Sequence, residues 1–337
     1  NGSQYPEMGM AAYAANAAFR AEIDEIDGLF QPMAGWSIAQ ALRGGVEPER
    51  FRRTSVIQPI IFAIQSALAA ALAAYGVKPS VVLGHSIGEV AAAERCGALT
   101  REQALKVILH RSTLQETTRG AGGMMVVALN DERLSVELAA SGARLEIAAL
   151  NSPTSTTAVG AQNEIRAFAR HCREKRIASI ELDLDYPFHS AAMDPLQPSM
   201  LERLADIAPV DGSVGFISTV TGVRADGSAL DADYWWRNAR SPVRFKNAVA
   251  AALEAGANLF VEISPHPILT GPTADIFGAA NASARAFETL TKNDAAENDP
   301  VLRILAQLVA NGAGFDPAAR VGPGPAEPIA LPSYPSL

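Results

Sequence analysis

The sequence has few cysteines and few charged residues. Among its 337 residues there are two cysteines and five histidines, and charged residues make up 19%. Cys96 and Cys172 cannot build a disulfide framework and neither lies in a C-x-x-C pair, so a disulfide-rich scaffold is excluded. The formal charge of −8 provides no basic excess, which argues against nucleic acid or an anionic membrane as the main partner.

An apolar leader is also missing from the start of the chain, so we expect no export and a reduced, cytoplasmic setting. Residues 54–77 contain no charged side chain, and this stretch is long enough to cross a bilayer. It nevertheless carries Gln58, Pro59, Gln65 and Ser66, and much of it is alanine. We interpret it as a buried helix in the core of a large α/β domain, with no membrane span.

The rest of the composition is that of a globular protein. Hydrophobic residues make up 48%, and the length corresponds to about two domains. Strand and helix patterns alternate on both sides of a distinct central stretch, which predicts an α/β fold with a parallel sheet covered by helices. We assign residues 1–121 and 188–290 to this large subdomain, with buried strands at 214–220 and 258–263 and a helix at 242–254 that has proline in its first turn.

The central stretch, residues 122–187, has a pattern of its own. Strands are predicted at 124–129, 145–150, 155–159 and 179–184, and helices at 131–140 and 162–175. Asp131 is the expected cap of the first helix, and Asn151-Ser152-Pro153 the expected turn between the second and third strands. The order β-α-β-β-α-β is that of a ferredoxin-like small subdomain inserted into the large one.

Both ends of the chain predict that it is a piece of a longer protein. The turn Asn1-Gly2-Ser3-Gln4 is of a kind that normally follows a strand, so we expect the first strand to be missing. Residues 291–337 are polar and proline-rich, which predicts a linker with one helix at 301–309.

The strongest functional signal is Gly84-His85-Ser86-Ile87-Gly88, a G-x-S-x-G match between a predicted strand and a predicted helix. That context is the one that supports a nucleophile elbow. The glycines permit a tight turn that exposes the Ser86 hydroxyl, and the following helix presents free amides to a reacting carbonyl. The pattern therefore predicts that Ser86 is a catalytic nucleophile.

A serine nucleophile needs a base, and the spacing of the histidines leaves two candidates. His189 follows the central stretch, and His266 lies in a loop after a predicted strand. A hydrolase triad of Ser86, Asp231 and His266 is therefore an open alternative. The other three histidines fit packing or surface positions: His85, His110 and His171.

The choice comes from a resemblance carried by six motifs in this order: Asn1-Gly2-Ser3-Gln4, Gly84-His85-Ser86-Ile87-Gly88-Glu89, Arg111-Ser112, Asn151-Ser152-Pro153, Tyr186-Pro187-Phe188-His189-Ser190 and Glu262-Ile263-Ser264-Pro265-His266-Pro267. Together they resemble the acyltransferase domain of a type I polyketide synthase, kin to the malonyl-CoA:acyl-carrier-protein transacylases. The motif Leu331-Pro332-Ser333-Tyr334-Pro335 resembles the linker that follows such domains. The resemblance implies an α/β-hydrolase-like large subdomain, a ferredoxin-like small one and an active site between them.

The resemblance also implies roles for individual residues. Ser86 is the residue that becomes acylated, and His189 is its general base. The backbone carbonyl of Asn238 is expected to orient His189, and the amides of Gln4 and Ile87 are expected to form the oxyanion hole. His266 falls in a loop that is structural in the family.

Arg111 and the motif before His189 carry the expected specificity. Arg111 matches the family position that grips the free carboxylate of a malonyl-type group, for which a guanidinium is well suited. Phe188 fills the space that a methyl branch needs and Ile87 also fits malonyl, whereas Tyr186 departs from the malonyl pattern. We expect malonyl-CoA as the preferred substrate, with methylmalonyl-CoA or another branched extender as the alternative.

The partners implied by the resemblance are an acyl carrier protein with its phosphopantetheine arm, malonyl-CoA, and the ketosynthase and other domains of a multifunctional synthase for polyketides such as antibiotics. Neither a metal nor a tightly bound cofactor is expected. The basic run at residues 170–176 could meet an acidic carrier protein, but we interpret it as a solvated helix face.

Overall fold

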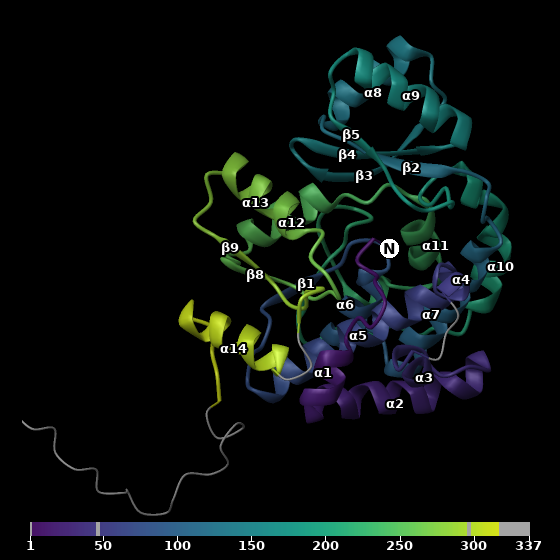
Figure 1. Ribbon diagram of the computed structural model, residues 1–337. Coiled ribbons are helices and arrows are strands. Elements are labelled where there is room, and N and C mark those ends of the chain that lie inside the picture. Colours follow the sequence, from purple (N-terminus) through teal and green to yellow (C-terminus); the bar gives the residue numbers. More distant parts are fainter. Residues whose placement is uncertain (1, 45–47, 295–297, 317–337) are drawn as a thin grey trace, which may run out of the picture.

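The computed structural model describes residues 2–44, 48–294 and 298–316. Figure 1 shows a large subdomain with a smaller one stacked on it. The uncharged stretch forms helix α5 (Thr54–Ala74), which is long and apolar enough to span a membrane, but 78% of its most apolar window is buried inside the protein. Helices α2 (Ala17–Ala34) and α7 (Arg101–Glu116) pack against it, so α5 is the central core helix of the large subdomain.

The large subdomain contains two small sheets. Strand β1 (Val81–Leu83) pairs in parallel with β6 (Gly215–Ile217), and β7 (Arg224–Ala225) runs antiparallel to β6. Strand β8 (Leu259–Glu262) pairs in parallel with β9 (Arg285–Glu288). The predicted α/β class with parallel strands is confirmed. The other elements of this part are α1 (Met10–Ala15), α3 (Ile38–Leu42), α4 (Pro48–Phe51), α6 (Gly88–Cys96), η1 (Ala191–Leu196), α10 (Gln197–Arg203), η2 (Gly227–Ala229), α11 (Ala232–Arg240), α12 (Phe245–Glu254) and α13 (Thr270–Ala279).

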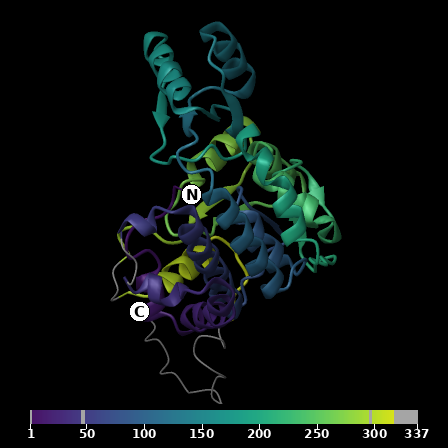
Figure 2. The same cartoon turned by 90° about the vertical axis from the view of Figure 1, so that its right-hand side faces the viewer.

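The small subdomain has the predicted ferredoxin-like order. Its elements are β2 (Gly123–Val127), α8 (Asp131–Ser141), β3 (Glu146–Ser152), β4 (Ser155–Gly160), α9 (Gln162–Glu174) and β5 (Ser179–Glu181). The strands form one antiparallel sheet in the order β3-β4-β2-β5. Helices α8 and α9 cover one face and stand clear of the large subdomain in Figure 2, so the other face is turned toward the large subdomain.

Three local predictions in this region are wrong. The side chain of Asn130, not that of Asp131, caps α8, because Asn130 is the last residue with extended backbone before the helix. Strand β3 continues to Ser152, so the turn to β4 is shorter than expected. Pro242 lies outside α12, because Val243 pairs with Ala149 of β3 in an isolated parallel bridge. This bridge ties the small sheet to the large subdomain.

The C-terminal helix is part of the folded core. Helix α14 (Pro300–Ala310) buries Val301, Ile304 and Leu308 in the same cluster as α5. The expected helix is confirmed, but within the described residues it packs as a core element and not as part of an extended linker. The Leu331–Pro335 motif lies outside the described residues.

Candidate active site

Ser86 lies at a sharp turn between β1 and α6. Its φ is 55°, in the left-handed region that non-glycine residues seldom adopt. The turn requires glycine at position 84, since a Cβ there would lie 2.1 Å from the Glu89 amide nitrogen. The amide of Ile87 precedes the first turn of α6, where helix amides lack partners within the helix. The sequence Gly84–Gly88 therefore folds as a nucleophile elbow.

His189 is brought to Ser86 from a distant part of the chain. The Nε2 atom of His189 lies 2.7 Å from the Ser86 Oγ atom, and the His189 side chain is buried. His189 Nδ1 donates a hydrogen bond to the Ser241 carbonyl at 2.9 Å. With its proton on Nδ1, a neutral imidazole presents a lone pair at Nε2, so Ser86 donates to His189. This is the arrangement of a nucleophile with a general base.

The prediction that the Asn238 carbonyl orients His189 is wrong. Asn238 lies within α11, where carbonyls run along the helix axis, and Ser241 is the first residue after the helix. The ψ of 156° at Ser241 turns its carbonyl out of the helix, so it is this group that His189 Nδ1 reaches. Sequence alone does not fix at which residue α11 ends.

The surroundings of His189 keep the imidazole neutral. Burial, followed by the positive charge of Arg111, lowers the pKa of His189 to about 3. The ring can therefore accept the Ser86 proton at any pH near neutrality. The carbonyl of Ser241 is a neutral partner, so its effect on the pKa of His189 is smaller than that of burial.

Arg111 is a buried cation held by neutral groups. The guanidinium, 1% exposed, donates from Nη1 to the side-chain oxygens of Gln58 and Gln115 at 2.7 and 3.0 Å. Its Nε atom donates to Asn238 Oδ1 at 3.1 Å, and its Nη2 atom donates to Ser86 Oγ at 2.9 Å. Burial lowers the pKa of Arg111 to about 10, so it stays charged at neutral pH. A cation beside the nucleophile without a direct anionic partner favours an incoming anion.

The comparisons with known proteins identify the family of this chain. The family model for the acyl transferase domain matches residues 1–313. This chain belongs to the acyl transferase domain family. The domain is an enzyme of the transferase class, and the resemblance drawn from the six motifs is confirmed.

The chain matches parts of very large synthases. The domain is 36% identical over 335 residues to erythronolide synthase EryA2 of Saccharopolyspora erythraea, a match that covers 99% of this chain and 9% of that protein. It is 35% identical over 296 residues to mycoketide-CoA synthase of Mycobacterium tuberculosis, covering 87% of this chain and 7% of that protein. The chain thus spans less than a tenth of the length of these relatives.

Solved structures of single acyltransferase domains share the fold. The acyltransferase domain from module 8 of the salinomycin polyketide synthase has a TM-score of 0.89 at 34% identity, covering 94% of this chain and 74% of that chain. A loading acyltransferase from the avermectin modular polyketide synthase has a TM-score of 0.86 at 34% identity, covering 91% of this chain and 97% of that chain. The fold class drawn from the sequence is therefore confirmed.

The acyl transferase domain does not assemble the alternative hydrolase triad. Asp231 caps α11 by accepting a hydrogen bond from the Tyr234 amide. The ring of His266 contacts the ring of Tyr5 edge-on at 6.3 Å between centroids. Within the described residues, the base that hydrogen-bonds Ser86 Oγ is His189. The same part of the chain contains no group of three or more His, Cys, Asp or Glu side chains arranged to hold a metal.

Tyr186 and Phe188 form a rigid pair next to His189. Their rings are stacked with centroids 5.1 Å apart and planes 4° from parallel. The Tyr186 hydroxyl donates to Glu116 at 3.1 Å and accepts from the Thr54 amide at 3.3 Å. The ends of α5 and α7 thereby fix Tyr186, and Tyr186 fixes the Phe188 ring.

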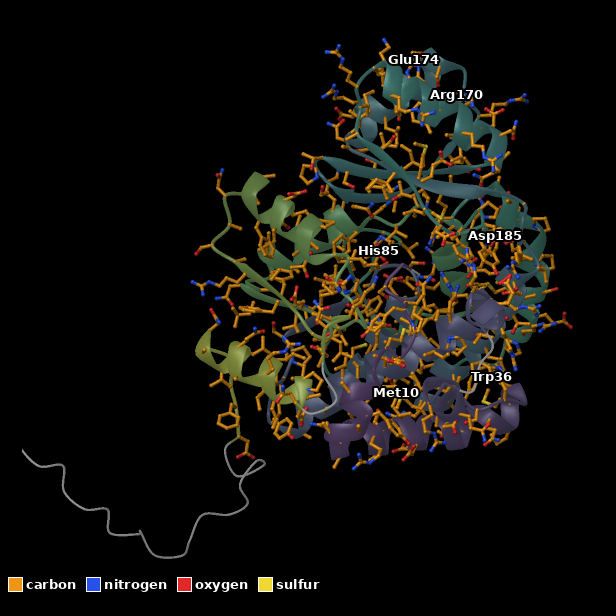
Figure 3. All side chains as sticks on the ribbon, in the orientation of Figure 1. Met10, Trp36, His85, Arg170, Glu174 and Asp185 are labelled. Atoms are coloured by element: carbon orange, nitrogen blue, oxygen red, sulfur yellow. The ribbon has the colours of Figure 1, made fainter. Side chains whose placement is uncertain are left out.

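Two predictions remain: Gln4, near the start of the chain, and the basic run at residues 170–176 in the small subdomain. The side chain of Gln4 accepts a hydrogen bond from the Gly2 amide, which shapes the first turn. This segment runs near the junction of the two subdomains in both ribbon views. Figure 3 shows His85 in the same central region, whereas Arg170 and Glu174 lie on α9 at the outer end of the small subdomain.

Several site residues were missed in the sequence. Gln58 and Gln115 hold Arg111, the side chain of Asn238 contacts it, and Glu89 is buried behind them. A usable signal was present in the sequence. Gln58 is a polar residue in a helix that is uncharged and mostly apolar, and Gln115 follows Arg111 by four residues, on the same helix face.

Proposed function

We propose that this domain transfers a malonyl-type acyl group from coenzyme A to the phosphopantetheine thiol of an acyl carrier protein. The observation that carries the proposal is Arg111, a buried guanidinium 2.9 Å from Ser86 Oγ whose hydrogen bonds go to neutral groups. A malonyl group ends in a carboxylate that a guanidinium binds through two parallel hydrogen bonds, and an acetyl group does not. Arg111 therefore selects the acyl group.

In the first half-reaction Ser86 becomes acylated. His189 Nε2 removes the Ser86 proton while Oγ attacks the thioester carbonyl. The amides of Gln4 and Ile87 hold the oxyanion. When the carbon–sulfur bond breaks, His189 returns the proton to the leaving thiol and coenzyme A departs. The carboxylate of the bound acyl group replaces Ser86 Oγ as the partner of Arg111 Nη2.

In the second half-reaction the carrier protein takes the acyl group. Its phosphopantetheine thiol gives a proton to His189 and attacks the Ser86 ester. The ester bond breaks, and His189 returns that proton to Ser86 Oγ, which restores the free enzyme. Neither step needs a metal or a tightly bound cofactor. Attack by water on the same ester is the competing reaction, which the protein limits by excluding water from the site.

Malonyl is the favoured acyl group within this class. The Phe188 ring is fixed by its stacking on Tyr186, which supports the expectation that it fills the space a branch at carbon 2 requires. An acyl transferase domain from SpnD, 27% identical with a TM-score of 0.84 over 93% of this chain and 74% of that chain, has been solved in complex with 2-(pent-4-yn-1-yl)malonyl. That complex supports a malonyl-type ligand for the fold. Methylmalonyl-CoA or another branched extender is the second candidate.

The relatives support a proposal for the setting of the domain. One relative is named as polyketide synthase GfsA of Streptomyces halstedii, and GfsA and erythronolide synthase EryA2 are each more than ten times the length of this chain. We place the domain in a multidomain synthase of the cytoplasm, beside a ketosynthase and the carrier protein that it loads.

Intact-protein mass measurement tests the proposal. The domain is incubated with malonyl-, methylmalonyl-, ethylmalonyl- and acetyl-CoA in equal amounts, and the adduct on Ser86 is identified. We expect malonyl as the main adduct, its transfer to an added carrier protein, and no adduct in the Ser86→Ala variant. Absence of a malonyl adduct from the wild-type protein would overturn the central claim. Release of free malonate with no transfer to the carrier would instead support the hydrolase.

A further inference from the structure

Glu89 is a buried carboxylate for which the reaction above has no use. It lies in the first turn of α6, three residues after the nucleophile, and is 0% exposed. Its oxygens accept hydrogen bonds from the Thr219 amide, from the Tyr234 hydroxyl at 2.9 Å and from Asn238 Nδ2 at 2.7 Å. A buried acid with this many donors is held in one orientation.

The amide of Asn238 connects Glu89 to the site. Its Oδ1 atom accepts the hydrogen bond from Arg111 Nε at 3.1 Å. Its Nδ2 atom donates to Glu89 and also to the backbone carbonyl of Ser86 at 3.1 Å. Since the nitrogen is committed to Glu89, the oxygen must face Arg111. One side chain therefore links the carboxylate, the guanidinium and the backbone of the nucleophile.

The same arrangement keeps Arg111 Nη2 available, while Nη1 is held by Gln58 and Gln115. A direct ion pair would occupy two guanidinium nitrogens and compete with a substrate carboxylate. Here Glu89 is linked to Arg111 through an intervening amide, and in its ionised form it raises the pKa of Arg111 against the larger lowering by burial. Arg111 stays charged and buried, while Nη2 points at Ser86 Oγ, where the acyl group binds.

We propose that Glu89 is a positioning residue for Arg111, which acts through the Asn238 amide to aim the guanidinium at the acyl carboxylate. The inference rests on the proposed function, because it takes Arg111 as the carboxylate-binding group. It goes further by stating which residues behind Arg111 create the preference for malonyl over acetyl.

The test compares acylation by malonyl-CoA and by acetyl-CoA in single-turnover measurements. For Glu89→Gln we expect the malonyl-to-acetyl ratio of kcat/KM to fall at least tenfold. The loss should fall mainly on KM for malonyl-CoA, while acetyl transfer changes less than threefold, because Ser86 and His189 are untouched. If Glu89 had a merely structural role, its replacement would lower kcat/KM for both substrates together.

Two further variants keep the test decisive if Glu89→Gln does not fold. Asn238→Ala removes the link, including its hydrogen bonds with Arg111 Nε and the Ser86 carbonyl, and leaves the other bonds of Glu89, so the same fall in the ratio is expected. Glu94→Gln is the matched control on the same helix. Glu94 pairs with Arg101 and accepts from Ser66, away from Arg111, so its variant should change the ratio less than twofold.

Arg111→Ala separates this inference from the proposed function. If Arg111→Ala retains the preference for malonyl, the proposed function fails. If Arg111→Ala loses it while Glu89→Gln and Asn238→Ala both retain it, only the present inference fails. In an Arg111→Ala background, Glu89→Gln should alter the ratio less than twofold, since the residue through which it acts is gone.

Discussion

At the scale of single residues, the site depends on two residues with an unusual backbone conformation. Ser86 and His189 have φ values of 55° and 60°. Non-glycine residues in this region cost free energy, which surrounding contacts must compensate. At Ser86 the carbonyl is held by Asn238 Nδ2 and by the Glu89 amide at 3.1 Å each. The two residues whose side chains meet at the site are thus among the five non-glycine residues with positive φ in the described part of the chain.

The histidine assignment gives the first prediction. His189→Ala removes the group 2.7 Å from Ser86 Oγ, so acylation by malonyl-CoA should slow by roughly 10²–10⁴-fold, as is typical for loss of a general base. His266→Ala should change the rate by less than about threefold, because that ring contacts Tyr5 and does not contact Ser86. Rapid-quench measurement of the acyl-enzyme checks both. The reverse pattern would revive the hydrolase alternative.

Phe188 gives the second prediction. Replacing its ring by a serine hydroxymethyl group should open space for a methyl branch. A single methyl is worth about 1–3 kcal/mol in a pocket, so Phe188→Ser should raise the methylmalonyl-to-malonyl ratio of acyl-enzyme by about tenfold or more. Competition between the two CoA esters, read by mass, measures it. An unchanged ratio with intact acylation would show that Phe188 does not set the branch preference.

At the scale of helices and strands, type and order were predictable because hydrophobic periodicity reports them directly. The six elements of the small subdomain follow from alternating patterns, and their antiparallel order matches the expectation. Boundaries were less predictable, because tertiary contacts set them. Pro242 resembles a first-turn proline, yet Val243 is drawn into a bridge with Ala149, which delays α12 until Phe245.

Helix α14 gives the third prediction. Ile304 is 0% exposed in the main core, so Ile304→Ala should lower the free energy of unfolding by about 2–5 kcal/mol. Gln307 lies exposed on the same helix, and Gln307→Ala should change the free energy of unfolding by less than about 0.5 kcal/mol. Urea unfolding measures both variants. Equal, small effects would mean that α14 behaves as a linker helix.

At the scale of the whole molecule, the buried site makes stability depend on pH. Burial lowers the pKa of His189 from 6.5 to about 3. Below pH 6.5 the unfolded chain binds a proton that the folded chain refuses, so stability is lost as the pH falls toward 3. Burial raises the pKa of Glu89 from 4.5 to about 7, which acts in the opposite direction. Its contribution is full below about pH 4.5 and is lost as the pH rises through 7.

These opposite signs give the fourth prediction. Compared with wild type, His189→Gln should flatten the fall in unfolding free energy between about pH 6.5 and 3, by up to about 1.4 kcal/mol per pH unit. Glu89→Gln should remove the loss of unfolding free energy that Glu89 causes between about pH 4.5 and 7, with the same limiting slope. Urea unfolding at half-unit pH intervals measures the differences. Curves parallel to wild type for both variants would contradict the burial of these charges.

The sequence by itself determined the fold class and the elbow at Ser86, because periodicity and turn chemistry are local, whereas the choice of His189 over His266 came from the family resemblance. Tertiary structure alone decided which carbonyl orients His189, which polar side chains hold Arg111 and which groups surround Glu89. Those answers depend on contacts between residues that are 53 to 149 positions apart in the chain. A backbone carbonyl carries no sequence signal, so replacing Asn238 by Ser241 as the partner of His189 required the structure.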